Sequence, residues 1–145
     1  MAFQFPLATV LRVRGIVEER EERLLQQIMI EISQAQEVLA RTNVQIVESD
    51  ALRLADILKP SIGHQLHASY GVVHQLKQSR KDLEEQLQKL EQLRGKQLMV
   101  YEAARRGREM LTDMRQEQRG EYDSDMARRE QKTLDDNHIA RRGRR

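Results

Sequence analysis

The sequence contains no cysteine and no tryptophan, and two phenylalanines and three tyrosines are its only aromatic residues. The absence of cysteine excludes a disulfide scaffold and a thiolate metal site. Large aromatic side chains usually dominate globular cores, so their scarcity argues against a compact domain. Only 39% of the residues are hydrophobic and 33% are charged. This apolar material suits a narrow helix–helix contact better than a thick core.

Long apolar runs are also missing. No stretch approaches the roughly 20 apolar residues that span a bilayer. The N-terminus has no basic segment of the kind that precedes the apolar part of a secretory signal, and Arg12 interrupts the one short apolar run near it. We therefore expect a cytoplasmic protein.

A strong excess of one charge is absent as well. The 25 basic and 23 acidic residues leave a net charge of +2. Disordered chains of this polarity usually carry a high net charge and scattered apolar residues. Here the charges nearly cancel and the apolar residues are periodic, so we expect a folded chain.

The first half of the chain carries a heptad pattern. Pro6 stands where proline is best tolerated, in the first turn of a helix, and no further proline occurs before Pro60. Residues spaced alternately by three and four form a seam, meaning the stripe along which one helix of a coiled coil packs on another. The seam positions are Leu7, Leu11, Arg14, Glu18, Glu21, Leu25, Ile28, Ile32, Ala35, Leu39, Thr42, Ile46 and Ser49. The seam is thus apolar at its start, polar for about two turns, and then apolar again.

A turn at residues 59–63 follows this first helix, which we predict over about residues 7–58. Proline disfavours the helical conformation of the residue before it, so Lys59 ends the helix. A second helix is predicted over about residues 64–138, followed by a basic tail at 139–145. Its seam positions are Leu66, Val73, Leu76, Arg80, Leu83, Leu87, Leu90, Arg94, Gln97, Tyr101, Ala104, Arg108 and Leu111.

The short connection favours antiparallel neighbours and sets the register of the two helices. Folding the chain back at the turn brings Ile46 opposite Leu76 and Ile32 opposite Leu90. The position of the turn was chosen without reference to these apolar pairs, so their match supports the fold-back. The predicted fold is therefore all-α: one domain over residues 1–145, built as a long antiparallel two-helix coiled coil.

The same register predicts less packing toward the termini. Arg14 faces Arg108, so we expect a weakly packed polar section there. Beyond about Arg115 the second helix has no intramolecular partner. Isolated helices are marginal in water, so we expect residues 116–140 to fray until a partner binds.

Patterns that carry chemistry are weak. Gly95-Lys96 lacks the upstream glycine of a phosphate loop. His64, His67 and His74 could share one helical face, but a metal site needs further ligands and a shielded pocket, so solvated histidines are the expected case. No serine or threonine has a plausible base beside it. We expect no catalytic residue, cofactor, metal or small-molecule substrate, and an enzyme is the least favoured class.

Several blocks at the two ends resemble one protein family. Phe3-Gln4-Phe5-Pro6-Leu7, followed by Leu11, Arg14 and the acidic run Glu18–Glu22, resembles the start of FliJ, the small soluble protein of the bacterial flagellar type III export apparatus. The segments 101–106 and 128–136, with Arg141 after them, look like the family's C-terminal half. Gln131-Lys132-x-Leu134-Asp135 is the most specific block, because nothing in a seam requires it.

The resemblance implies a non-catalytic, stalk-like protein. Members of the family are antiparallel coiled coils similar to the central stalk of rotary ATPases. They insert their terminal end into the hexameric export ATPase ring, promote its assembly and turnover, contact the cytoplasmic domain of the export-gate membrane protein, and help recycle export chaperones. The implied location is the cytoplasm, with peripheral association with the inner membrane at the flagellar basal body. We expect a monomeric hairpin when the chain is free.

Candidate contact residues follow from the matching blocks. The expected contacts with the ATPase ring are Phe3, Phe5, Leu7, Leu11, Gln131, Lys132, Leu134, Asp135 and Arg141. The four N-terminal ones fit a hydrophobic end-cap of the hairpin equally well. The resemblance places the gate-contacting surface nearer the turn, where this sequence has Val38, Thr42, Val72 and Leu76.

Two other functions remain open at this point. The arginine-rich end, residues 141–145, is of the kind that binds phosphate backbones, although no aromatic residue accompanies it for base stacking. The chain would then be a nucleic-acid-associated coiled coil. The other possibility is a purely structural spacer or a homodimer.

Overall fold

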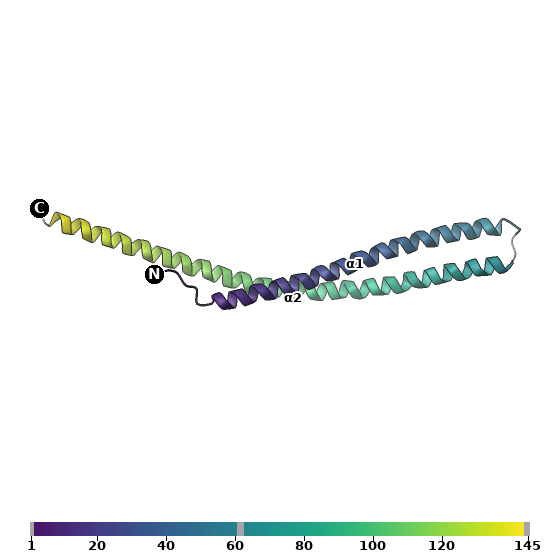
Figure 1. The fold of residues 1–145 in the computed structure, drawn as a ribbon, viewed down its shortest axis with the longest axis horizontal. Coiled ribbons are helices and arrows are strands. Elements are labelled where there is room, and N and C mark those ends of the chain that lie inside the picture. The colour runs from purple at the N-terminus through teal and green to yellow at the C-terminus, as the bar shows by residue number, and fades with distance from the viewer. Residues whose placement is uncertain (1, 61–62, 144–145) are drawn as a thin grey trace. The chain divides into compact units, whose positions relative to one another are not determined.

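A computed structural model of the chain consists of two long helices joined by a short connection (Figure 1). It describes residues 2–60 and 63–143, without the side chains of 64–66. Helix α1 is Ala8–Ile57 and helix α2 is Gly63–Arg142. No strand occurs in the described ranges. The predicted all-α fold, a two-helix coiled-coil hairpin, is confirmed.

Pro6 shapes the entry into α1. The Ala8 N–H donates to the carbonyl of Phe5 at 3.1 Å, which closes a turn with Pro6 at its second position. Proline is favoured there because its fixed φ suits the turn. The Leu11 N–H then donates to the carbonyl of Leu7 at 2.9 Å. The helix therefore begins one residue after the predicted start.

The far end of α2 differs from the prediction. We expected a basic tail from residue 139, but α2 continues to Arg142. Neither glycine nor proline occurs between Gly120 and Gly143, whose N–H donates to the carbonyl of Ile139 at 3.0 Å. Arg141 and Arg142 in the last turn suit the negative end of the helix dipole. The rest of the predicted tail, Arg144 and Arg145, lies outside the described residues.

The chain divides into two compact units. The terminal unit combines residues up to Arg20 with residues from Tyr101 onward, and the turn unit is residues 21–100. Each unit pairs a part of α1 with a part of α2, so the two are described separately.

The turn unit has a narrow apolar seam. Its buried residues from the predicted seam of α1 are Glu21, Ile28, Ile32, Ala35, Thr42 and Ile46, and the one from α2 is Val73. Leu76, Leu83, Leu87 and Leu90 of α2 are half-buried, and Arg94 is exposed. The predicted seam residue Leu66 lies outside the described side chains. Burying such an apolar side chain fully stabilises the fold by roughly 1.5–3 kcal/mol, so the seam supplies the main stabilisation.

Contacts between the helices of this unit follow the predicted register to within about one helical turn. The Arg53 guanidinium lies 4.6 Å from the centre of the Tyr70 ring. Lys77 Nζ lies 4.0 Å from Asp50 Oδ2. Ala35 and Val38 line one surface hollow together with Leu83. The fold-back at the turn therefore holds in the turn unit.

Candidate functional site

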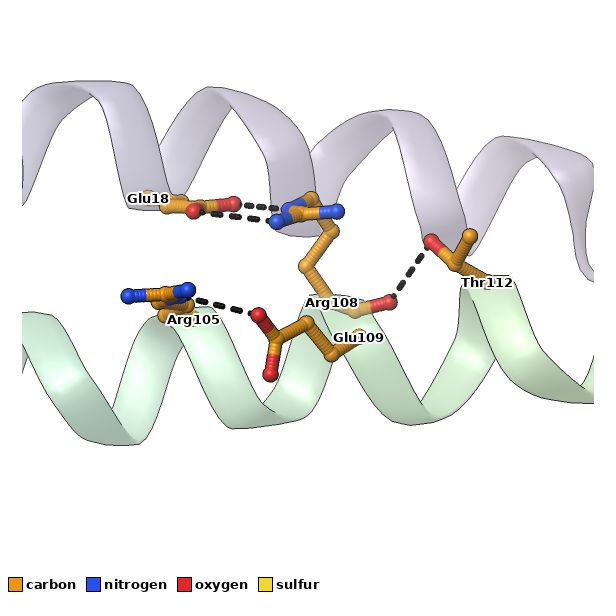
Figure 2. A network of polar contacts seen from close by, with 5 residues as sticks. All are labelled: Glu18, Arg105, Arg108, Glu109 and Thr112. Atoms are coloured by element: carbon orange, nitrogen blue, oxygen red, sulfur yellow. Dashed lines mark hydrogen bonds and ion pairs between the residues drawn. The ribbon is translucent and has the colours of Figure 1, made fainter.

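The polar section of the terminal unit carries an ion pair between the helices (Figure 2). Arg108 on α2 donates through Nε and Nη2 to the Glu18 carboxylate on α1, the Nη2–Oε1 distance being 3.3 Å. The two side chains are 33% and 14% exposed. The hydrogen bond to Glu18 raises the pKa of Arg108, against the lowering effect of burial. Because an arginine guanidinium is always charged in a protein, both hydrogen bonds to Glu18 are charge-assisted.

Neighbouring groups complete this section within α2. Arg105 Nε donates to Glu109 Oε1 at 2.8 Å, and the Thr112 hydroxyl donates to the carbonyl of Arg108 at 3.0 Å. The hydrogen bond to Glu109 likewise raises the pKa of Arg105. Figure 2 shows Arg108 reaching across to the other helix, whereas Arg105 turns along its own.

The predicted register placed Arg14 opposite Arg108, and the structure places it within one residue of that position and shows which group the Arg108 side chain reaches. Arg14 lies against Gly107, where an added Cβ would come 3.3 Å from its Nη1. Arg108 reaches Glu18 instead. An arginine side chain can reach over about one helical turn, so the two guanidinium groups need not lie opposite each other. The charge-assisted bond from Arg108 to Glu18 then joins the two helices in this section.

A second polar contact lies in the turn unit. Glu21 is only 7% exposed. Gln97 Nε2 donates to Glu21 Oε2 at 2.6 Å and to the Glu21 carbonyl at 3.1 Å. A buried carboxylate is costly unless it is hydrogen-bonded, so this pair favours one alignment of the helices over shifted ones.

The N-terminal segment packs on α2. Phe5 is buried, and Phe3, Leu7 and Leu11 are half-buried. The Phe3 and Tyr122 rings lie 5.7 Å apart at 49°. This is the end-cap arrangement, and the four residues predicted as ring contacts are all partly or fully covered in it. An open groove of about 620 Å³ runs beside them.

The length of the bare part of α2 is also corrected. We expected no intramolecular partner beyond about Arg115, yet Phe3 contacts Tyr122, and Met126 is half-buried. The segment before Pro6 extends along α2, which the heptad pattern of the helices does not describe. Extending the fold-back register past Pro6 would have placed Phe3 near residue 119 and so indicated this contact.

From Ala127 to Arg142 every residue of α2 is exposed. This bare segment contains all five predicted C-terminal contact residues: Gln131, Lys132, Leu134, Asp135 and Arg141. Leu134 is 69% exposed and Ile139 is 68% exposed. Thr133 donates to the carbonyl of Arg129 within the same helix. Leu134, within the most specific sequence block, and Ile139, four residues after it in the printed sequence, are therefore exposed to solvent among charged side chains.

The four predicted gate residues lie in the turn unit but do not form one exposed surface. Val38 and Val72 are exposed at 47% and 53%, whereas Thr42 is buried and Leu76 is half-buried. The Thr42 hydroxyl donates to the carbonyl of Val38 at 2.9 Å. Thr42 and Leu76 belong to the seam, so only the two valines face outward.

Among the residues that the structure describes, no three histidine, aspartate or glutamate side chains are grouped so that they could hold a metal ion. His64, one of the three histidines of the predicted shared face, lies outside the described side chains. Neither helix, as far as it is described, contains a stretch that is long and apolar enough to cross a membrane.

The chain matches no family model, no curated protein and no solved structure.

Proposed function

We propose that this chain is a non-catalytic, stalk-like component of the bacterial flagellar type III export apparatus, which binds and stimulates the export ATPase ring. Its further proposed partners are the cytoplasmic domain of the export-gate membrane protein and the export chaperones. Its proposed location is the cytoplasm, at the inner-membrane face of the flagellar basal body.

The bare segment of α2, residues 127–142, is the observation that carries this proposal. In this segment Leu134 is 69% exposed and its neighbour Asp135 is exposed as well. An exposed helix end of this kind gains packing only from another molecule. Burial of Leu134 in a partner would contribute about 1.5–3 kcal/mol to binding.

The action on the ATPase is by binding alone. A stalk changes turnover by binding one conformation of the ring more tightly than another, and the difference in affinity sets how far the population shifts. Several charges of the terminal unit are paired with one another, such as Glu18 with Arg108 and Arg105 with Glu109. A surface of this kind can contact the ring without binding tightly at one fixed point.

The exposed apolar residues of the turn unit are the proposed surface for the gate and chaperones. Val38 and Val72 are the two predicted gate residues that a partner can reach. Their substitution by aspartate should weaken gate binding and leave ATPase stimulation unchanged, because they belong to a different unit.

The test compares the full chain with a variant ending at Ala127, using the cognate export ATPase. The variant keeps Tyr122 and Met126, so the terminal unit retains its packing. We expect full helical folding, judged by circular dichroism of the retained residues, and loss of ATPase stimulation.

Point variants refine the test. Leu134→Ala should reduce stimulation by about tenfold, which corresponds to 1.4 kcal/mol. Leu52→Ala is the matched control, since Leu52 is 67% exposed and lies in the turn unit. Undiminished stimulation by the variant ending at Ala127 would overturn the proposal, and equal losses for both leucine variants would remove the assignment to the bare segment.

A further inference from the structure

The groove beside the N-terminal segment combines apolar and cationic side chains. Phe3, Phe5 and Leu11 are among its apolar lining residues, and Arg12 of α1 and Arg115 of α2 are its charged ones. No acidic residue lines it. The groove therefore presents two like charges beside apolar walls.

Both arginines lack a counter-ion within the described part of the chain. The arginines of the polar section behave differently, since Arg105 and Arg108 each pair with a glutamate. Arg119, one turn beyond Arg115, lies 3.9 Å from Asp123. Two unpaired guanidinium groups on one groove raise the local positive potential, and a guanidinium fork matches a carboxylate in geometry and charge.

We propose that this groove is the docking site for a short acidic segment of a partner protein, in which an aliphatic or aromatic side chain stands next to a carboxylate. The apolar side chain would occupy the wall formed by Phe3, Phe5 and Leu11, and the carboxylate would bridge Arg12 and Arg115. The inference deepens the proposed function by naming the chemistry of the partner at this end of the chain, and it rests on that proposal.

The surroundings favour a peptide over a nucleic acid. Base binding needs an open aromatic face, whereas Phe5 is buried and Phe3 packs on Tyr122. Asp113 and Glu117 flank Arg115 in the sequence of α2. The carboxylates of Asp113 and Glu117 would repel a nucleic acid that runs along α2, whereas a single carboxylate held in the groove avoids this repulsion.

The test uses the full chain and a fluorescein-labelled six-residue peptide in which glutamate alternates with leucine and phenylalanine. Fluorescence anisotropy should show saturable binding that weakens as salt is raised. The same peptide with glutamine in place of glutamate should bind at least about tenfold more weakly, a difference of 1.4 kcal/mol.

Variants locate the contact. Arg12→Gln and Arg115→Gln should each weaken the acidic peptide about tenfold. Arg119→Gln is the control on the same helix and should change nothing. Both groove arginines are exposed, so these variants should keep the native circular dichroism spectrum.

Several results would overturn the inference: no saturable binding of the acidic peptide, equal binding of the glutamine peptide, or unchanged binding by the two groove variants. If a thymidine oligonucleotide binds more tightly than the peptide, and if this binding is lost in the variant Arg12→Gln, the groove would be assigned to nucleic acid instead. Peptide binding without any stimulation of the export ATPase would leave the groove assigned and overturn only the proposed function.

Discussion

Arg108 is the residue on which the polar section of the terminal unit depends. Its partner Glu18 is 14% exposed, so removal of the guanidinium leaves a largely covered carboxylate without its counter-ion. Truncating one partner of such a pair is more harmful than losing an exposed surface pair. The contact also joins residues far apart in sequence, whereas Arg105 and Glu109 lie on one helix.

Arg108→Ala should therefore lower the melting temperature of the chain, and Arg105→Ala should leave it nearly unchanged, because the Arg105 side chain is 55% exposed and pairs only along its own helix. Thermal unfolding followed by circular dichroism measures both. The double variant Glu18→Ala with Arg108→Ala should recover part of the loss. Equal shifts for the two single variants would contradict this account of the ion pair.

The identity of these partners exceeded what the sequence could predict. Heptad spacing places Cα atoms, and it put Glu18 and Arg108 in the seam. It could not select between Arg14 and Glu18 as the neighbour of Arg108, because an arginine side chain reaches over about one turn. Arg14 can approach Gly107 because glycine has no side chain. The spacing of apolar residues carries no information about such a contact.

At the scale of one helix, α1 is divided into a covered and an open face. Ile32 is 5% exposed, whereas Ile30, two positions earlier, is 57% exposed. The same residue type thus occurs on both faces of one helix. Comparing substitutions at these two positions separates the effect of burial on stability from the effect of helix propensity.

Ile32→Ala should destabilise the chain by about 2–5 kcal/mol, because it removes buried methyl groups and leaves a cavity. Ile30→Ala should stay within about 0.5 kcal/mol of the parent. Urea unfolding of both variants gives the two values. A loss for Ile30→Ala as large as that for Ile32→Ala would show that the seam has been assigned to the wrong face.

The seam of each helix was predictable because burial alone decides it. The three-and-four spacing that places Leu25, Ile28 and Ile32 on one side of a helix requires no knowledge of the partner. Arg94 is the exception in α2: it occupies a seam position but is exposed. A long charged side chain at a seam position can extend past the edge of the two-helix contact into solvent, and the residue spacing does not predict this.

The free end of α2 is the second prediction at this scale. Residues 127–142 have no tertiary cover, so their amides should exchange much faster than those of residues 80–90, which include seam leucines. Tyr122, which packs on Phe3, should mark the limit of protection. Protection of residues 130–140 equal to that of residues 80–90 would show that the end is stable without a partner.

At the scale of the whole molecule, everything proposed for the ends depends on the chain folding back within one copy. The fold-back was predictable from Pro60 and the short connection, which leave few other arrangements. The contact of Phe3, in the N-terminal segment, with Tyr122 was missed because the helical heptad pattern stops at Pro6, although the same register continued past Pro6 would have placed Phe3 near residue 119. The groove at Arg12 and Arg115 follows from that segment and so escaped the sequence analysis.

Because the chain has no cysteine, spin labels can be placed freely. Gln34 and Gln86 line one surface hollow in the turn unit, and both are exposed, so Gln34→Cys and Gln86→Cys should carry labels without disturbing the seam. Electron–electron double resonance on the labelled chain, diluted with unlabelled chain, measures the intramolecular distance. We expect roughly 20 Å, from an interaxial spacing of about 10 Å plus the label tethers. A distance near 78 Å, about that of a continuous helix between these positions at 1.5 Å per residue, would contradict the fold-back and every proposal that depends on it.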